Sequence, residues 1–217
     1  MKKTSHTTVI TSSIAIIFAA SVALYFVAER KVRADLLVEA KTFAQEIDFT
    51  QVKTLSGTRA DLETESYKKL KAQLTEMQNR NESIAFVYLA GIRDIPYREK
   101  TDTLQDDMEI FFYLDGEPGD SYDVSLPGDV YDSASQSLFT AFETGEASVY
   151  GPESDQWGTW VTGIVVHGNT PNERILFGLD YAAKTYYENI FLYLLKLIAL
   201  PILLVVLGLV LYYRRKK

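Results

Sequence analysis

The sequence predicts an α+β domain held between two transmembrane helices. Apolar runs at residues 9–28 and 190–213 predict the two helices. Between them, a helical pattern of apolar residues comes first and strand-like patterns follow, which predicts an antiparallel sheet with helices packed on it. The chain has 217 residues, so the stretch between the runs is the size of one ordinary domain.

Residues 9–28 form the first predicted span. They contain no charged residue, and a helix of this length, rising about 1.5 Å per residue, crosses a hydrocarbon layer of about 30 Å. A cleaved signal peptide is the alternative, because Ser21 and Ala23 fit the small positions of a cleavage site. The run is longer than a usual signal core and continues into helical sequence, which favours a retained span. Both interpretations place the following residues outside the cytoplasm.

Residues 190–213 form the second predicted span. Its one charge, Lys196, lies near the outer end, where the long side chain can reach the headgroups. Pro201 is tolerated in a transmembrane helix, because neighbouring groups can satisfy the carbonyl that it leaves unbonded. The run is therefore expected to cross the bilayer.

The flanking cations predict the orientation of the chain in a cytoplasmic membrane. Residues 214–217 are all Lys or Arg, and such clusters favour the cytoplasmic side. With two spans, both tails, residues 1–8 and 214–217, are then cytoplasmic and the domain faces the outside or the periplasm. Lys2 and Lys3 agree with this orientation, whereas the cations at positions 30, 31 and 33 do not.

The predicted outer segment is strongly acidic. Residues 29–189 hold 15 Lys and Arg against 29 Asp and Glu, a formal charge of −14. Such a surface makes nucleic acid and anionic lipid poor partners. The acids serve either as a solvated face or as an attraction for cations and amines. The chain has no Cys, which excludes disulfides, thiol chemistry and cysteine-ligated zinc.

Two helices are predicted at the start of this segment. Residues 29–54 continue the first span as a membrane-proximal helix with one apolar face, formed by Val32, Leu36, Ala40, Phe43 and Ile47. That face either packs on its own domain or pairs with a second copy as a short coiled coil. After a break at Gly57, a second helix is expected from about Asp61, with an apolar side formed by Leu62, Tyr67, Leu70, Leu74 and Met77.

Strand-like patterns occupy the rest of the segment. Residues 84–90 and 109–115 are rich in aromatic and branched residues, and a long acidic loop, 116–132, follows them. A short helix fits residues 135–143. Further along, a turn is expected at Gly151-Pro152, and then a hairpin formed by the segments WGTWVTGIVVHG and RILFGLD. The last helix is expected to begin at Tyr181 and to run through residues 184–189 into the second span.

Several motifs in order resemble the extracytoplasmic Cache-type (PAS-like) sensor domain that precedes histidine kinases, diguanylate cyclases and chemoreceptors. They are LSGTRADLE, YKKLKAQLTEMQ, FVYLAG, FFYLDGEPGD, PGDVYD, LFTAFETG, VYGPESDQWGTWVTG and FGLDYAA, within residues 55–183. The resemblance implies a long N-terminal helix, a central antiparallel sheet and a small-molecule pocket on one sheet face. Such receptors continue into an output domain, whereas four residues follow Tyr213. We therefore expect either a membrane partner that carries the signal or an N-terminal part of a longer receptor.

The candidate ligand site combines tyrosines with carboxylates. Tyr113 and Asp115 share a strand face by the period of two, and the acidic loop that they face carries Tyr122 and Tyr131. Aromatic rings with carboxylates suit an amine or another cationic small molecule. A tyrosine-rich sheet face with solvated acids is the alternative.

Two further features extend the candidate site. Trp157 and Trp160 point to opposite faces of a regular strand unless Gly158 marks a bulge, so at most one of them is expected to line a pocket. Asp180 is expected to cap the following helix. The resemblance gives it a second role, because it is similar to the ligand-contacting acid of some amine-binding members of the family.

No motif for catalysis, cofactor or metal binding is present. The chain lacks a nucleophile elbow, a phosphate loop and a His-Glu-x-x-His motif, and it has only two His. The acidic loop lacks the regular spacing of a calcium loop. We expect a membrane-anchored sensor without enzymatic activity that acts as a homodimer or with a membrane signalling partner. The alternative is an envelope protein that uses a PAS-like domain for dimerisation or protein contacts, without a ligand.

Overall fold

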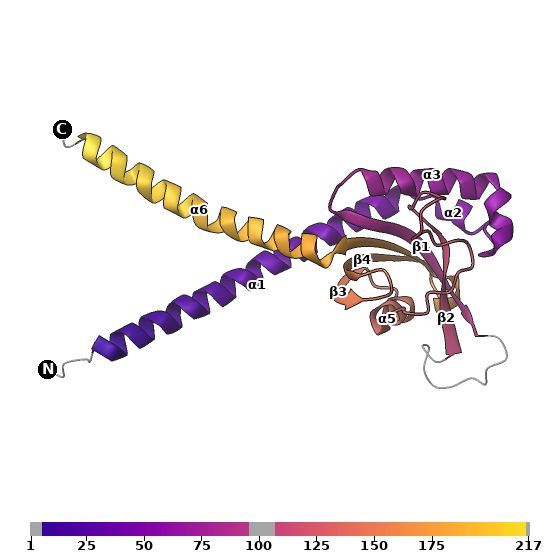
Figure 1. The fold of residues 1–217 in the computed structure, drawn as a ribbon, viewed down its shortest axis with the longest axis horizontal. Coiled ribbons are helices and arrows are strands. Elements are labelled where there is room, and N and C mark those ends of the chain that lie inside the picture. Colours follow the sequence, from indigo (N-terminus) through magenta and orange to yellow (C-terminus); the bar gives the residue numbers. More distant parts are fainter. Residues whose placement is uncertain (1–5, 96–106, 216–217) are drawn as a thin grey trace. The chain divides into compact units, whose positions relative to one another are not determined.

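The computed structural model describes residues 6–95 and 107–215 and shows an α+β protein with a five-stranded antiparallel sheet (Figure 1). The strand order is β2-β1-β5-β4-β3. The strands are β1 Ile84–Asp94, β2 Met108–Asp115, β3 Ser148–Ser154, β4 Thr159–His167 and β5 Ile175–Ala182. The α-helices are α1 His6–Glu46, α2 Phe49–Val52, α3 Glu65–Asn79, α5 Gln136–Thr144 and α6 Ala183–Arg215, with short 3-10 helices at Arg59–Glu63 and Pro171–Glu173. The α+β class and the sheet are as predicted.

The chain divides into two compact units. One unit is Met1–Val32 with Tyr187–Lys217, and the other is Arg33–Tyr186. The second unit contains the whole sheet, α2, α3, α5 and the last turns of α1. It is called the sheet unit below.

Alternation along the strands gives the sheet two apolar faces. On one face, which we call the pocket face, Tyr88 and Ala90 of β1 join Ile110 and Phe112 of β2 in a core cluster beneath α5. Helix α5 contributes its own buried side to this cluster through Leu138, Phe139, Ala141 and Phe142. A Gly in a left-handed conformation, Gly145, ends the helix.

The opposite face, which we call the helix face, is covered by α1 and α3. Leu36, Ala40, Phe43 and Ile47 of α1 are buried, so this stretch of the predicted stripe packs on its own domain. The helix lies close to β4, because a Cβ built on Gly163 would come within 3.0 Å of the Ala40 Cβ. Helix α3 buries the predicted Tyr67, Leu70, Leu74 and Met77.

The second predicted helix begins later than expected, and Asp61 has another role. Thr64 caps α3, with its hydroxyl accepting from the Tyr67 amide at 3.2 Å. The buried Asp61 carboxylate instead accepts from the Ser56 amide at 2.8 Å, the Ser56 hydroxyl at 2.9 Å and the Gly57 amide at 2.8 Å. Asp61 therefore fixes the loop before α3.

Replacing Asp61 with Ala is expected to destabilise the protein by about 2–4 kcal/mol, because buried donors lose a charged acceptor. The matched control is Glu63→Ala, since Glu63 is an exposed carboxylate in the same 3-10 helix. Urea unfolding of both variants measures the difference. Equal midpoints for the two variants would contradict the structural role of Asp61.

Two local predictions are wrong. Gly151-Pro152 lies inside β3, at an irregularity of the β3–β4 register between Tyr150 and Glu153, and does not form a turn. Asp180 lies inside β5, where it is paired with Phe86 of β1 and Thr162 of β4, so it cannot cap α6, which begins at Ala183. The ladder continues for two residues past Asp180, and this extension removes the capping role.

Helices α1 and α6 include the two apolar runs. Among the residues that the structure describes, no helix meets the length and hydropathy that a membrane crossing needs. Side chains 9, 10, 12 and 13 of the first run lie outside the described set. So do side chains 200–202, 204, 205 and 208–210 of the second run, and residues 1–5, 216 and 217 of the predicted tails.

Candidate functional site

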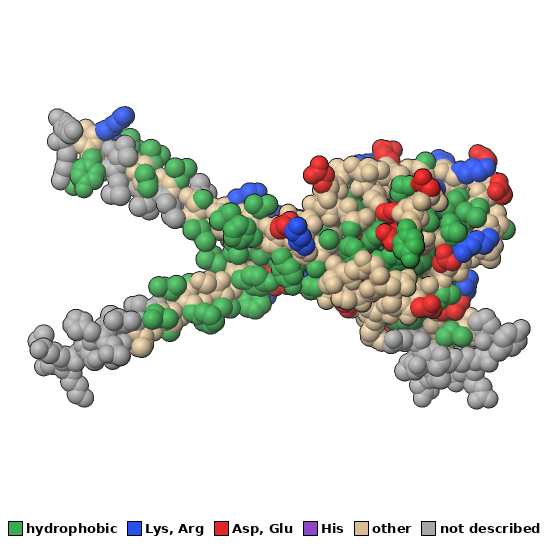
Figure 2. Space-filling view, viewed as in Figure 1, with side chains coloured by type: hydrophobic (Ala, Val, Ile, Leu, Met, Phe, Trp, Pro, Cys, Tyr) green, Lys and Arg blue, Asp and Glu red, His purple; other side chains and the backbone are tan. Residues whose placement is uncertain are grey.

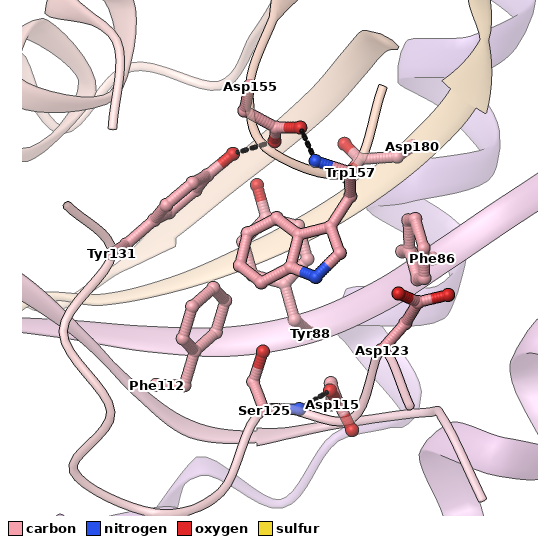
Figure 3. Close-up of a pocket in the computed structure, with 10 residues that line it drawn as sticks. All are labelled: Phe86, Tyr88, Phe112, Asp115, Asp123, Ser125, Tyr131, Asp155, Trp157 and Asp180. Carbon is pink, nitrogen blue, oxygen red and sulfur yellow. Dashed lines mark hydrogen bonds between the residues drawn. The ribbon is translucent and has the colours of Figure 1, made fainter. Parts of the chain in front are cut away.

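A pocket opens on the pocket face of the sheet, between the strands and two loops (Figure 3). Three strands supply part of its wall, the acidic loop after β2 supplies another part, and the turn between β3 and β4 closes it. The volume of this pocket is about 30 Å³, which suits a small polar group. The lining residues are Phe86, Tyr88, Phe112, Asp115, Asp123, Ser125, Tyr131, Asp155, Trp157 and Asp180.

Aromatic rings form a continuous wall of this pocket. The ring centroid of Phe112 lies 5.6 Å from that of Tyr88, 5.2 Å from that of Tyr131 and 6.2 Å from that of Trp157. Tyr88 lies flat on β5 because residue 178 is Gly, where a Cβ would overlap the tyrosine ring. The rings therefore offer faces and edges to whatever enters the pocket.

Asp155 organises the turn that closes the pocket. Its Oδ1 accepts from the Trp157 amide at 2.9 Å, the Gly158 amide at 3.0 Å and Trp160 Nε1 at 2.8 Å. Its Oδ2 accepts from the Tyr131 hydroxyl at 2.5 Å, which ties the acidic loop to the turn (Figure 3). Neutral donors thus satisfy this carboxylate on both oxygens.

Asp180 is the chemically exceptional group of the pocket. The residue is only 5% exposed, and its Oδ1 has no hydrogen-bond partner among the described residues. Burial raises the pKa of Asp180 to about 7, the nearby Asp155 charge adds to the rise, and a hydrogen bond with the Thr162 side chain opposes it. A buried carboxyl with an unsatisfied oxygen is ready to receive a donor, most favourably a cationic one.

Asp115 lies at the edge of the pocket, and the Lys71 ammonium neutralises its charge. Its Oδ1 accepts from Lys71 Nζ of α3 at 2.6 Å, and its Oδ2 accepts from the Ser125 amide at 2.5 Å. Burial raises the pKa of Asp115, and the hydrogen bond and charge of Lys71 oppose the rise. This carboxylate already has a cation, so Asp180 is the better anchor for a ligand.

Some of the predicted site residues line the pocket in the structure, and others lie away from it. Asp115, Tyr131, Trp157 and Asp180 line the pocket. Tyr113 lies on the helix face, where it and Phe111 lie against Gly91, and burial raises its pKa. The Tyr122 side chain is fully exposed at 101%. Tyr113 and Tyr122 are therefore left out of the proposed site.

The two tryptophans do not follow the strand alternation that the sequence suggested. Trp157 lies in the turn before β4, so the period of two does not relate it to Trp160. Trp157 lines the pocket, and Trp160 lines a second cavity beside it. The expectation that at most one of them lines a pocket is wrong, because the strand begins only at Thr159.

Sequence reasoning missed Asp155 and the aromatic residues of β1 and β2. A signal for Asp155 is present, since Asp followed three residues later by Gly is a common turn pattern. The period of two along residues 84–90 also places Phe86 and Tyr88 on one face. The partnership of Asp155 with Tyr131 joins distant segments and has no local sequence signal.

No metal site is indicated within residues 6–95 and 107–215. In that part of the chain, no three His, Asp or Glu side chains are grouped so as to hold a metal ion. Comparisons with protein-family models, with curated proteins and with solved structures give no match for this chain.

Proposed function

We propose that this protein is a membrane-anchored sensor whose outward-facing sheet unit binds a small cationic amine in the pocket. The observation that carries the proposal is the buried Asp180 carboxyl, one oxygen of which has no partner among the described residues, in a pocket walled by aromatic rings. An ammonium group would supply the donor that Asp180 lacks and would be attracted by the ring faces.

The charges around the pocket support a cation and disfavour an acid. The described lining residues include four carboxylates and no Lys or Arg. Among the described residues, the Lys71 ammonium pairs with Asp115, from the α3 side. A ligand carboxylate would therefore lack a cationic partner and would be repelled by its surroundings.

The Cache-type identity that the motifs suggest is part of this proposal. It is supported by the long α1 on one face of a five-stranded antiparallel sheet and by the pocket on the other face. A small-molecule pocket on one sheet face is what the resemblance implies. The proposed class of protein is a receptor module without catalytic activity of its own.

The membrane anchor is supported by the apolar runs and by the surface of the helices. Figure 2 shows hydrophobic side chains along the described parts of α1 and α6, and carboxylates spread over the sheet unit. Large apolar residues on both helices are more than half exposed, among them Ile14, Ile16, Phe18, Phe191 and Leu203. Release from cell membranes by detergent but not by alkaline carbonate is the expected behaviour of the anchored chain.

A relay from the site to the helices is supported by Arg33. Its guanidinium donates from α1 to the carbonyls of Val149 at 3.3 Å and Gly151 at 2.7 Å in β3, and lies 5.7 Å from the ring centroid of Tyr186 in α6. The same strand leads into the Asp155 turn of the pocket. A ligand that binds one arrangement of this turn better than another would shift the position of α1 through Arg33.

Replacing Arg33 with Ala is expected to uncouple the helices while leaving amine affinity within about threefold. The chain has no Cys, so spin labels can be placed at Val27→Cys and Phe191→Cys, which are exposed positions on α1 and α6. The amine should change the label distance in the parent chain and not in Arg33→Ala. Arg30→Ala is the control, because Arg30 is an exposed cation one turn away. An unchanged ligand response in Arg33→Ala would exclude this route.

The proposed function is tested by thermal unfolding of the full chain in detergent with a panel of amines and matching carboxylates. At least one amine should raise the unfolding temperature in proportion to its occupancy, whereas the carboxylates should not. If no amine stabilises the protein, the sensing proposal fails. The interaction protein without a ligand then becomes the better account.

A further inference from the structure

A second cavity adjoins the amine pocket on the same sheet face. The volume of this second cavity is about 20 Å³. Tyr88, Tyr131 and Asp155 line both cavities and form the wall between them. The far side of the second cavity carries Glu153 of β3 and Thr162 of β4.

Hydroxyl groups and two carboxylates, Glu153 and Asp155, supply the acceptors in the lining of this second cavity. Ser133, Ser135, Ser137 and Ser154 contribute hydroxyl groups. Among the described residues the buried Ser133 Oγ has no partner, and the Glu153 carboxylate accepts only from Ser137 Oγ, at 2.5 Å. An ammonium group, which has three donors and no acceptor, complements such a lining.

Carboxylates of both cavities affect the two tyrosines that separate the cavities. Burial raises the pKa of the Tyr88 and Tyr131 hydroxyls, and Asp180, Asp155 and Glu153 all add to the rise. The described lining residues of both cavities include no Lys or Arg. A ligand with one ammonium at Asp180 would leave the Glu153 charge without a cation.

We infer that the ligand is a dication, an α,ω-diamine or longer polyamine, with one ammonium at Asp180 and the other at Glu153. The inference rests on the proposed function, because it assumes the amine at Asp180. Asp180 lies on β5 and Glu153 on β3, with β4 between them, so the strands are about 10 Å apart. The methylene chain would pass the rings of Tyr88 and Tyr131 once the wall opens.

Opening the wall requires Tyr131 to release Asp155. Tyr131 comes from the acidic loop and is only partly buried, whereas Tyr88 is buried and lies on β1, an interior strand of the sheet. Asp155 Oδ1 keeps its three donors when the tyrosine leaves, whereas Oδ2 gives up the one donor that it has among the described residues. Tyr131 is therefore the side chain that would move when a long diamine enters.

Calorimetric titration of the full chain with diamines of increasing length and with monoamines of matched length tests the inference. The best diamine should bind about tenfold or more tightly than its matched monoamine, as one additional charged hydrogen bond provides. Glu153→Gln should remove this advantage and leave monoamine affinity within about twofold. Glu146→Gln, an exposed carboxylate that lines neither cavity, should change neither affinity.

The outcomes separate this inference from the proposed function. Equal affinity for diamines and monoamines, or equal weakening of both by Glu153→Gln, would overturn the dication and keep the amine site. Absence of binding by every amine would overturn both. The comparison of ligands on the parent chain needs no variant, so a folding defect in Glu153→Gln cannot obscure the result.

Discussion

Asp180→Asn is expected to weaken the binding of a cationic amine by about thirtyfold or more. Truncating one member of a buried, hydrogen-bonded charge pair costs about 2–5 kcal/mol, and the amide cannot supply the charge. The Asn side chain has nearly the same shape, so the pocket walls should remain in place. Calorimetric titration at pH 8, where the parent Asp180 with its pKa of about 7 is ionised, measures the loss.

Two controls make this result specific. Asp120→Asn removes one carboxylate from the exposed part of the acidic loop, and Tyr122→Ala removes the exposed tyrosine that the sequence had placed in the site. Both variants should bind the amine like the parent chain. Similar weakening by Asp120→Asn would mean that overall charge, and not Asp180, attracts the ligand.

The same substitution is expected to stabilise the protein in the absence of ligand, but only at high pH. The pKa of Asp180 is about 7 in the folded chain against an ordinary value of 3.8. Between these values the folded state holds a proton that the unfolded state has released, so the contribution of Asp180 to stability is greatest below about pH 4 and is lost as pH rises through 7. Three pKa units correspond to about 4 kcal/mol as an upper bound.

The Asp180→Asn variant does not lose stability in this way as the pH rises, although its amide must find hydrogen-bond partners of its own in the pocket. We expect Asp180→Asn to exceed the parent chain by about 1–3 kcal/mol at pH 8 and to show no advantage at pH 4. Urea unfolding can be followed by tryptophan fluorescence, because Trp157 and Trp160 both contact the Asp155 turn. Equal stability of the two proteins at pH 8 would show that the folded state does not penalise the Asp180 charge.

Gain of stability on removing a functional group is typical of binding sites. In this protein the aromatic walls and the buried position raise the free energy of the ionised Asp180 carboxyl, and a bound ammonium would lower it. The unfavourable burial and the proposed affinity therefore have the same physical cause.

Periodicity predicted those parts of the fold in which packing follows local pattern. The stripe from Leu36 to Ile47 and the buried side of α3 both lie against the sheet, as a repeat of three to four residues requires. The hairpin of β4 and β5 also follows from alternation and turn residues. These features depend on neighbours within one or two turns of the chain.

Features that depend on distant partners escaped prediction. Asp180 resembled a helix cap because a helix follows it, but pairing with β1 and β4 extends the strand past it. Tyr122 and Tyr131 belong to the same loop, and only Tyr131 finds a partner, Asp155, across the pocket. Local sequence could indicate that rings and acids gather here, but not which of them meet.

Proton release on amine binding tests the central claim most directly. At pH 6 the Asp180 carboxyl, with a pKa of about 7, is mostly protonated in the free protein, and an ammonium at this site favours the ionised form. Titrations in buffers of different ionisation enthalpy should show nearly one proton released at pH 6, almost none at pH 8.5 and none at either pH in Asp180→Asn. Tight amine binding at pH 6 without proton release, or with the same release in Asp180→Asn, would contradict the account.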